Sequence, residues 1–226
     1  MKTIGILQTG FLEGEMAERH GQFPEMFKNL LGIDAFKYRT YAVAQNEFPV
    51  HETECDGWIV TGSKHGAYED HAWIPPLEIL IRKLKESSRP TIGICFGHQI
   101  MAQALGGTVE KSDKGWGAGQ QEYLRKDTGK TVRLLAFHQD QITQQPPKSE
   151  VTHTSEFCEF AGLRYSPTCF SLQPHPEFTK DLTRDLVDMR RGNVMPENVA
   201  IKVLEILDQE NDRDEFASFI RDLLNS

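Results

Sequence analysis

The chain has 226 residues, of which 38% are hydrophobic, and it carries a formal net charge of −8 at pH 7. This length suits one α/β domain with at most a modest extension, and the apolar content is ample for a core. The acidic balance argues against a nucleic-acid surface, and the lack of a signal-peptide core or of an apolar run near ~18 residues predicts a cytoplasmic protein without a membrane partner.

Strand and helix signals alternate over the first hundred residues. The predicted strands cover 3–8, 35–43, 57–61 and 91–95, and the predicted helices cover 23–31, 74–86 and 97–105. This alternation predicts a mostly parallel central sheet with helices on both faces, the α/β class. Ligands of such sheets bind at the carboxyl ends of the strands. The long polar segment 9–24 is interpreted as a lid or pocket rim, with a simple surface loop as the alternative.

The pattern changes after residue 108. Short β-like runs follow one another, separated by turn residues, at 120–125, 131–136, 151–155, 163–166 and 168–172. We interpret them as an antiparallel or mixed edge that completes the same sheet.

Helical signals return at the end of the chain. Thr179 can cap a helix that runs to about Arg191, and Pro196 begins another that runs to about Gln209. The segment 214–224 is amphipathic, which predicts packing against the domain, with a partner-binding face as the alternative. We therefore expect a single domain over 1–226 with a helical C-terminal extension from about 195 to 226.

The most informative motif is Gly93-Ile94-Cys95-Phe96-Gly97, between the predicted strand at 91–95 and the predicted helix at 97–105. Glycines on either side let the two backbones approach and place the cysteine on a sharp strand-to-helix turn, the geometry of a nucleophile elbow. The positive potential of a helix N-terminus favours the reactive thiolate. The alternative is a cysteine that only packs as a small buried hydrophobe.

A second motif, Pro174-His175-Pro176-Glu177, follows the last predicted strand. The prolines fix the backbone on both sides of His175 and keep it extended. Residues two apart in an extended chain point to the same side, so the Glu177 carboxylate can accept a ring N–H and stabilise the imidazolium. Cys95, His175 and Glu177 are therefore predicted as nucleophile, base and orienting group. The alternative is a structural turn.

These two motifs, about eighty residues apart, resemble the class I (triad-type) glutamine amidotransferase domain over most of the chain, to about residue 190. Within that family the chain is similar to free-standing proteins related to the glutaminase domain of GMP synthase and to γ-glutamyl peptidases. The resemblance implies a flavodoxin-like fold. It also implies that Cys95 attacks the side-chain amide of glutamine, that ammonia leaves, and that water hydrolyses the thioester, with His175 as base and acid.

The resemblance also implies an oxyanion hole. One donor is the backbone N–H of Phe96, next to the nucleophile. The other belongs to the turn at Gly62-Ser63, where the family often has two glycines; we favour the Ser63 amide, with Gly62 giving the turn its freedom. Taken alone, this segment is also typical of an ordinary strand-end turn.

Three further residues are predicted to bind substrate by the same resemblance: Gln99, His138 and Gln139. Gln99 lies one helical turn beyond the nucleophile. The segment His138-Gln139-Asp140 resembles the family's His-Gly-Asp segment, which holds the α-amino and α-carboxyl end of glutamine. Gln139 in place of glycine leaves room for a substrate other than plain glutamine, and Asp140 is interpreted either as part of this site or as a loop-forming residue.

No cofactor or metal is expected. The histidines at 65, 71, 98, 138 and 153 lack the spacing of a metal site. The cysteines at 55, 95, 158 and 169 also lack it, and we expect reduced thiols.

Three functions remain open. The first is glutamine hydrolysis, with ammonia released or passed to a separate synthetase chain, because no synthetase domain fits in this length. The second is a γ-glutamyl peptidase or hydrolase acting on γ-glutamyl peptides or glutathione conjugates. The third is a catalytically silent regulatory or interaction protein. An open pocket lined by 9–24 and Gln139 would favour the second.

Overall fold

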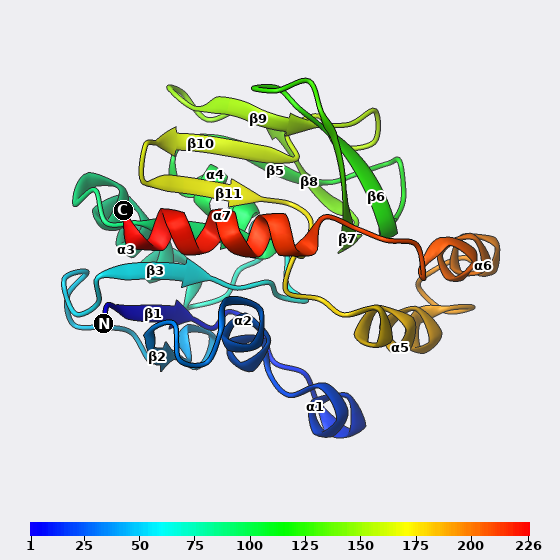
Figure 1. Ribbon diagram of the computed structural model, residues 1–226, viewed down its shortest axis with the longest axis horizontal. Coiled ribbons are helices and arrows are strands. Elements are labelled where there is room, and N and C mark those ends of the chain that lie inside the picture. Colours follow the sequence, from blue (N-terminus) through cyan, green and yellow to red (C-terminus); the bar gives the residue numbers. More distant parts are fainter.

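The computed structural model describes the whole chain, residues 1–226, as a nine-stranded mixed sheet with helices on both faces (Figure 1). The strands of this sheet are β1 (Thr3–Leu7), β2 (Lys37–Tyr41), β3 (Gly57–Val60), β4 (Thr91–Ile94), β6 (Gly117–Arg125), β7 (Thr131–His138), β9 (Glu150–Thr154), β10 (Gly162–Ser166) and β11 (Cys169–Leu172). Their order is β2-β1-β3-β4-β11-β10-β9-β6-β7. Two further strands, β5 (Thr108–Lys111) and β8 (Asp140–Gln144), form a separate ladder.

The helices are α1 (Gly14–His20), α2 (Phe23–Leu31), α3 (Ile74–Glu86), α4 (Phe96–Ala104), α5 (Lys180–Arg190), α6 (Glu197–Ile206) and α7 (Arg213–Asn225), with a 3₁₀ turn at η1 (Val43–Gln45). Every helix is too short or too polar to span a bilayer.

The sheet is parallel from β2 to β11 and antiparallel from β11 to β7. All residues of β3, β4 and β11 are buried, as expected for parallel strands covered on both faces. The predicted α/β class, the parallel centre and the mixed edge are confirmed. The sequence did not reveal α1, which has no buried residue, nor the ladder of β5 and β8, in which β5 buries only Val109. Neither α1 nor β5 therefore carries a strong apolar period.

Two layers of helices cover the sheet. The layer of α3 and α4 packs on one face through Leu77, Ile81 and Ile100, and the layer of α2 and α7 packs on the other through Phe27 and Ile220. Figure 1 shows α7 lying along the front of the sheet, with α1, α5 and α6 beyond the carboxyl ends of the parallel strands. The segment 214–224 thus packs on the domain, as its amphipathic pattern predicts.

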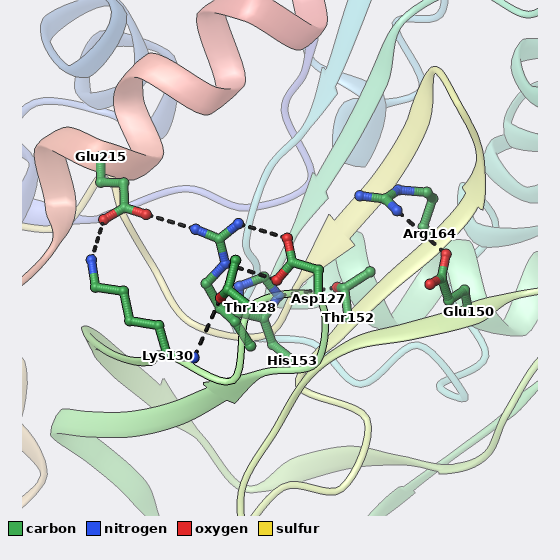
Figure 2. A network of polar contacts seen from close by, with 9 residues as sticks. Asp127, Thr128, Lys130, Glu150, Thr152, His153, Arg164 and Glu215 are labelled. Atoms are coloured by element: carbon green, nitrogen blue, oxygen red, sulfur yellow. Dashed lines mark hydrogen bonds and ion pairs between the residues drawn. The ribbon is translucent and has the colours of Figure 1, made fainter.

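Polar contacts also join α7 to the antiparallel half of the sheet (Figure 2). Glu215 of α7 accepts from Arg125 Nη1 at 2.7 Å and from Lys130 Nζ at 2.8 Å, and Arg125 also bridges to Asp127. Burial lowers the pKa of the neighbouring His153 to about 4, so this histidine is neutral at pH 7. Because the ion pairs are partly exposed, the buried apolar stripe of α7 contributes more to its attachment than they do.

The predicted helix boundaries after residue 179 are also close to those observed. The Thr179 hydroxyl accepts from Leu182 N at 3.1 Å and caps α5. Gly192 has a φ of 71°, a conformation that suits glycine and ends the helix, and α6 begins directly after Pro196.

Gly97 permits the close approach of α4 to β3. A Cβ placed on Gly97 would lie 2.2 Å from Val60 O, a backbone atom that cannot move aside cheaply. Gly93 is equally tight, since a Cβ there would lie 2.4 Å from Gly97 O. The spacing of these glycines around Cys95 therefore serves the approach of strand and helix predicted from the sequence.

We expect Gly97→Ala to lower the free energy of unfolding by about 3 kcal/mol, at the upper end for forced overpacking. Chemical denaturation measures this loss. Gly129→Ala is the matched control: Gly129 has a φ of 70° but nothing lies within 4 Å of its added Cβ, so only the backbone cost of about 1 kcal/mol applies. Equal losses for both variants would contradict the steric argument.

Candidate active site

Three neighbouring parallel strands, β3, β4 and β11, end at the same edge of the sheet, and a predicted site residue follows each of them. Gly62 follows β3, Cys95 follows β4 and His175 follows β11. A Cβ placed on Gly62 would lie 3.0 Å from His175 Cε1 and 3.7 Å from Cys95 Cβ. The sheet topology thus brings together three segments that are far apart in the sequence.

Cys95 occupies the sharp turn between β4 and α4. Its φ of 54° and ψ of −105° are rare for a residue with a side chain and cost about 1–3 kcal/mol. The surroundings maintain this conformation, because Cys95 N donates to Leu172 O at 2.8 Å and Gln99 N donates to Cys95 O at 3.0 Å. The Cys95 side chain lies at the N-terminus of α4 and lines a pocket.

The imidazole of His175 is held by a carboxylate. Its Nδ1 lies 2.7 Å from Glu177 Oε1, and both side chains are almost completely buried. The ring also stacks on Phe178, with centroids 3.8 Å apart. Since Nδ1 is engaged by Glu177, Nε2 is the nitrogen available to the Cys95 thiol.

The electrostatics favour a charged imidazole. Burial by itself lowers the pKa of His175, but the charges and hydrogen bonds of Glu177 and Cys95 outweigh this and raise the pKa to about 10. A carboxylate at Nδ1 therefore stabilises the imidazolium form of His175.

The turn after β3 lies next to Cys95 and His175 at Gly62. Thr61 Oγ1 donates to Gly62 O at 3.1 Å, and Thr9 Oγ1 lies 3.0 Å from the same oxygen. Because a trans peptide directs its C=O and N–H in opposite directions, anchoring the Gly62 carbonyl turns the Ser63 N–H the other way. Ser63 lines the pocket together with Cys95. Phe96 is the first residue of α4, so its N–H has no acceptor within the helix.

Ser63→Pro removes the N–H of residue 63, and we expect it to lower kcat on the order of 10²–10³-fold, as the loss of one oxyanion donor does. Steady-state kinetics on the best substrate measure the effect. Ser63→Ala is the matched control, since it keeps the N–H and removes only the hydroxyl that accepts from His65 N. If both variants lost activity equally, the side chain rather than the amide of Ser63 would be responsible.

The predicted substrate-binding residues also line the pocket. Gln99 Nε2 donates to Asp140 O at 2.9 Å and to Gln173 Oε1 at 3.0 Å, which leaves its Oε1 for a ligand. His138 Nδ1 lies 3.0 Å from the same Asp140 oxygen, and burial lowers the pKa of His138 to about 4. His138 is thus neutral at pH 7, and Gln139 extends beside it at the pocket wall.

The pocket is open and has a volume of about 650 Å³. The segment 9–24 contributes five residues to its lining, Phe11, Leu12, Glu13, Met16 and Phe23. The interpretation of 9–24 as a pocket rim is confirmed. An ion pair of 2.7 Å between Lys64 and Glu13 joins this rim to the turn at Ser63.

One wall of the pocket was not foreseen from the sequence. It consists of Trp116, Phe137, Met189, Arg190 and Val194. Trp116 and Phe137 pack with ring centroids 5.1 Å apart, and Trp116 Nε1 donates to Val194 O at 2.9 Å. Met189 and Arg190 are neighbours on α5, but the other three come from separate segments and share no motif with them, so only the fold reveals their proximity. Nothing in the sequence indicated that Thr9 and Thr61 would hold the Gly62 carbonyl.

Comparison with known proteins gives one consistent assignment. Residues 28–187 match the family model "Glutamine amidotransferase class-I". Gamma-glutamyl peptidase 4 of Arabidopsis thaliana is 27% identical over 191 residues, which cover 78% of this chain and 76% of that protein. A GMP synthase [glutamine-hydrolyzing] of Aromatoleum aromaticum is 32% identical over 154 residues, 61% of this chain and 29% of that protein.

Solved structures are similar over nearly the whole chain. A glutamine amido transferase from Methylobacillus flagellatus superposes with a TM-score of 0.77 at 20% identity, covering 99% of this chain and 92% of that one. At this identity the likeness shows the fold, which is the flavodoxin-like fold expected from the two motifs.

Proposed function

The chain belongs to the class I glutamine amidotransferase family, and from this premise we propose that it hydrolyses a γ-glutamyl amide bond through a thioester on Cys95. The observation that carries the proposal is the buried pair of His175 and Glu177, 2.7 Å apart, at the strand edge that also holds Cys95. Such a pair activates a thiol and supports a positive charge on the ring.

In the first half of the reaction the Cys95 sulfur attacks the γ-carbonyl carbon and forms the C–S bond. The carbonyl oxygen becomes an oxyanion, which accepts from the N–H groups of Ser63 and Phe96. The C–N bond then breaks, and the proton on His175 Nε2 passes to the leaving nitrogen.

In the second half, neutral His175 takes a proton from a water molecule, which attacks the thioester. The same two N–H groups hold the second oxyanion. The C–S bond breaks, the thiolate is restored beside the imidazolium, and glutamate is released. Glu177 keeps Nδ1 protonated throughout and stabilises the charged ring.

We further propose that the leaving group is larger than ammonia. A volume of about 650 Å³ lies within the range of pockets that enclose drug-sized ligands, well beyond the needs of glutamine alone. Residues of the pocket rim at 9–24 and of the wall at Trp116 line this volume together with Cys95. This volume favours γ-glutamyl peptides or conjugates as substrates, and the relative from Arabidopsis is named a gamma-glutamyl peptidase.

Glutamine hydrolysis is the second candidate, supported by the relatives named as GMP synthases, one from Aromatoleum aromaticum and one from Methanopyrus kandleri. The chemistry would be the same, with ammonia as the leaving group. Ammonia would then pass to a separate synthetase chain or to solvent.

Arg190 offers a contact for the far end of a peptide substrate. It lines the pocket at the end of α5, no carboxylate of the protein forms an ion pair with it, and its Nε is buried without a hydrogen-bond acceptor. A buried donor left without a partner is costly, and a guanidinium binds a carboxylate through two parallel hydrogen bonds. We therefore assign Arg190 to the free carboxylate of the leaving peptide.

Arg190→Gln should raise KM for a γ-glutamyl dipeptide about tenfold or more, because a charge-assisted contact of about 1.5–3 kcal/mol is lost. KM for glutamine should not change. Arg184→Gln on the same helix is the matched control, since Arg184 is paired with Asp208 on the surface. A dipeptide amide, which lacks the carboxylate, should be insensitive to the Arg190 variant; equal loss on both peptides would contradict the assignment.

A substrate panel analysed by mass spectrometry tests the proposed function. Glutamine, γ-glutamyl dipeptides and a glutathione conjugate are compared for release of glutamate. Faster turnover of the peptides supports the larger leaving group, and turnover of glutamine alone overturns it. If none of the panel yields glutamate or an acyl-enzyme on Cys95, the hydrolysis itself is contradicted.

A further inference from the structure

Two histidines and a glutamate meet beside the pocket, on the segment between β3 and α3. His65 Nδ1 lies 3.2 Å and His71 Nε2 lies 2.7 Å from the same oxygen, Glu69 Oε2. The three ligand atoms all lie within 4.8 Å of one another, and each side chain is partly open to solvent. The spacing of these residues in the sequence follows no helical metal motif, so only the fold brings them together.

The backbone that carries this cluster is firmly held. Ala67 is fully buried, and its carbonyl accepts from Gln103 Nε2 of α4 at 2.8 Å. Glu69 N donates to Gly66 O at 3.1 Å, which closes a tight turn. At the other end Trp73 is 5% exposed and stacks on the His71 ring, with an interplanar angle of 13°. The three side chains are therefore positioned before any ligand arrives.

We propose that His65, Glu69 and His71 bind a divalent transition-metal ion of the Zn²⁺ class. Two imidazoles and one carboxylate are a ligand set that zinc takes with a water molecule in the fourth position. Metal–ligand distances near 2.0–2.1 Å in a tetrahedron require ligand atoms about 3.4 Å apart. The His65–Glu69 separation already approaches this value, and the His71–Glu69 separation needs to open by less than about 1 Å. Mg²⁺ and Ca²⁺ prefer oxygen ligands and do not suit the two imidazoles.

The site goes beyond the proposed hydrolysis but is connected to the same machinery. His65 lines the pocket, and its N–H donates to Ser63 Oγ at 3.2 Å. Trp73, which contacts both imidazoles, packs against Phe96 with ring centroids 5.5 Å apart. A bound ion therefore lies close to Ser63 and Phe96, the two residues that the proposed mechanism uses as backbone donors.

Zn²⁺ titration by calorimetry tests the proposal, carried out in Cys95→Ala protein because the Cys95 thiolate can itself bind zinc. We expect one Zn²⁺ per chain, no response to Mg²⁺, and at least about tenfold weaker binding in His71→Gln, which keeps a hydrogen-bonding group for Glu69 but is a poor ligand. His51→Ala is the matched control, since His51 is exposed and lies outside the cluster.

Tryptophan fluorescence gives a second readout. Ni²⁺ bound at the site lies close to Trp73 and should quench its emission, and Trp73→Phe should remove the quenching while the stoichiometry remains one. The substitutions act on binding measured without substrate, so the result is independent of whether γ-glutamyl bonds are hydrolysed.

Absence of stoichiometric Zn²⁺ binding overturns the proposal, as does binding that His71→Gln and His65→Ala leave unchanged. In either case the three residues are a hydrogen-bonded cluster only. Circular dichroism of each variant, matched to the parent, ensures that a loss of binding reflects the ligands rather than the fold.

Discussion

Cys95→Ala should abolish hydrolysis of every γ-glutamyl substrate, with a loss in kcat on the order of 10⁶-fold, as for removal of a catalytic nucleophile in other hydrolases. The proposed thioester needs a sulfur at this position, and no other thiol lines the pocket. Alanine keeps the Cβ, so the unusual φ of 54° is strained to the same degree in both proteins. Hydrolysis is measured by release of glutamate, and stability by chemical denaturation.

The control for this variant is Cys169→Ala. Cys169 is also a buried, free cysteine, but it is the first residue of β11, at the end of the strand away from Cys95, and does not line the pocket. It should lose stability through a small cavity and keep its turnover. Intact mass spectrometry should show the acyl group on the wild-type chain and not on Cys95→Ala. Turnover retained without Cys95 would remove the thiolate mechanism.

Glu177→Gln should lower kcat on the order of 10⁴-fold, the loss seen when the carboxylate that orients a catalytic histidine becomes an amide. The amide has nearly the shape of the carboxylate, but it cannot stabilise the imidazolium, and it can present an N–H to Nδ1 and favour the wrong tautomer. KM should change much less than kcat, because Glu177 is buried behind His175 and is not part of the pocket lining.

The pH profile provides a further test of Glu177. The pKa of His175 is raised from 6.5 to about 10, so the imidazolium persists as the pH rises above 6.5. The alkaline limb of kcat/KM should therefore lie well above pH 6.5. The charge of Glu177 is the largest of the effects that raise the pKa of His175. Removing this charge should therefore lower that pKa and move the alkaline limb of kcat/KM to lower pH. Glu177→Asp, which keeps the charge, should shift the limb less. An unmoved limb would show that another group sets the charge of His175.

Much of the fold could be predicted from the sequence, because apolar residues recur at regular intervals along most of its helices and strands. The helices at 23–31 and 74–86 were predicted with the observed limits, since both have one apolar face and a proline in the first turn. The order of the Cys95 and His175 motifs was equally informative. Their resemblance to one family predicted that the two side chains meet. The run at 168–172 was assigned to the antiparallel or mixed edge, and only the structure shows that β11 is parallel to β4 and ends beside it.

The remaining parts of the site depend on contacts that no local pattern encodes. Arg190 reaches the pocket only because α5 returns to the carboxyl ends of the strands. The cluster of His65, Glu69 and His71 depends on one tight turn at Gly66, and neither the helical period nor the strand period describes that turn. The two hydroxyls that hydrogen-bond to the Gly62 carbonyl belong to Thr9 and Thr61, which are 52 residues apart in the sequence.

These hydrogen bonds to the Gly62 carbonyl bear on how the proposed reaction is regulated. Both hydroxyls that anchor the Gly62 carbonyl belong to this chain, and both side chains are fully buried. The Ser63 N–H that we propose as an oxyanion donor is therefore oriented by this chain alone, and we expect turnover in dilute, purified protein without a partner. The rate of hydrolysis would then depend on the concentrations of enzyme and substrate, and not on the binding of an activating protein.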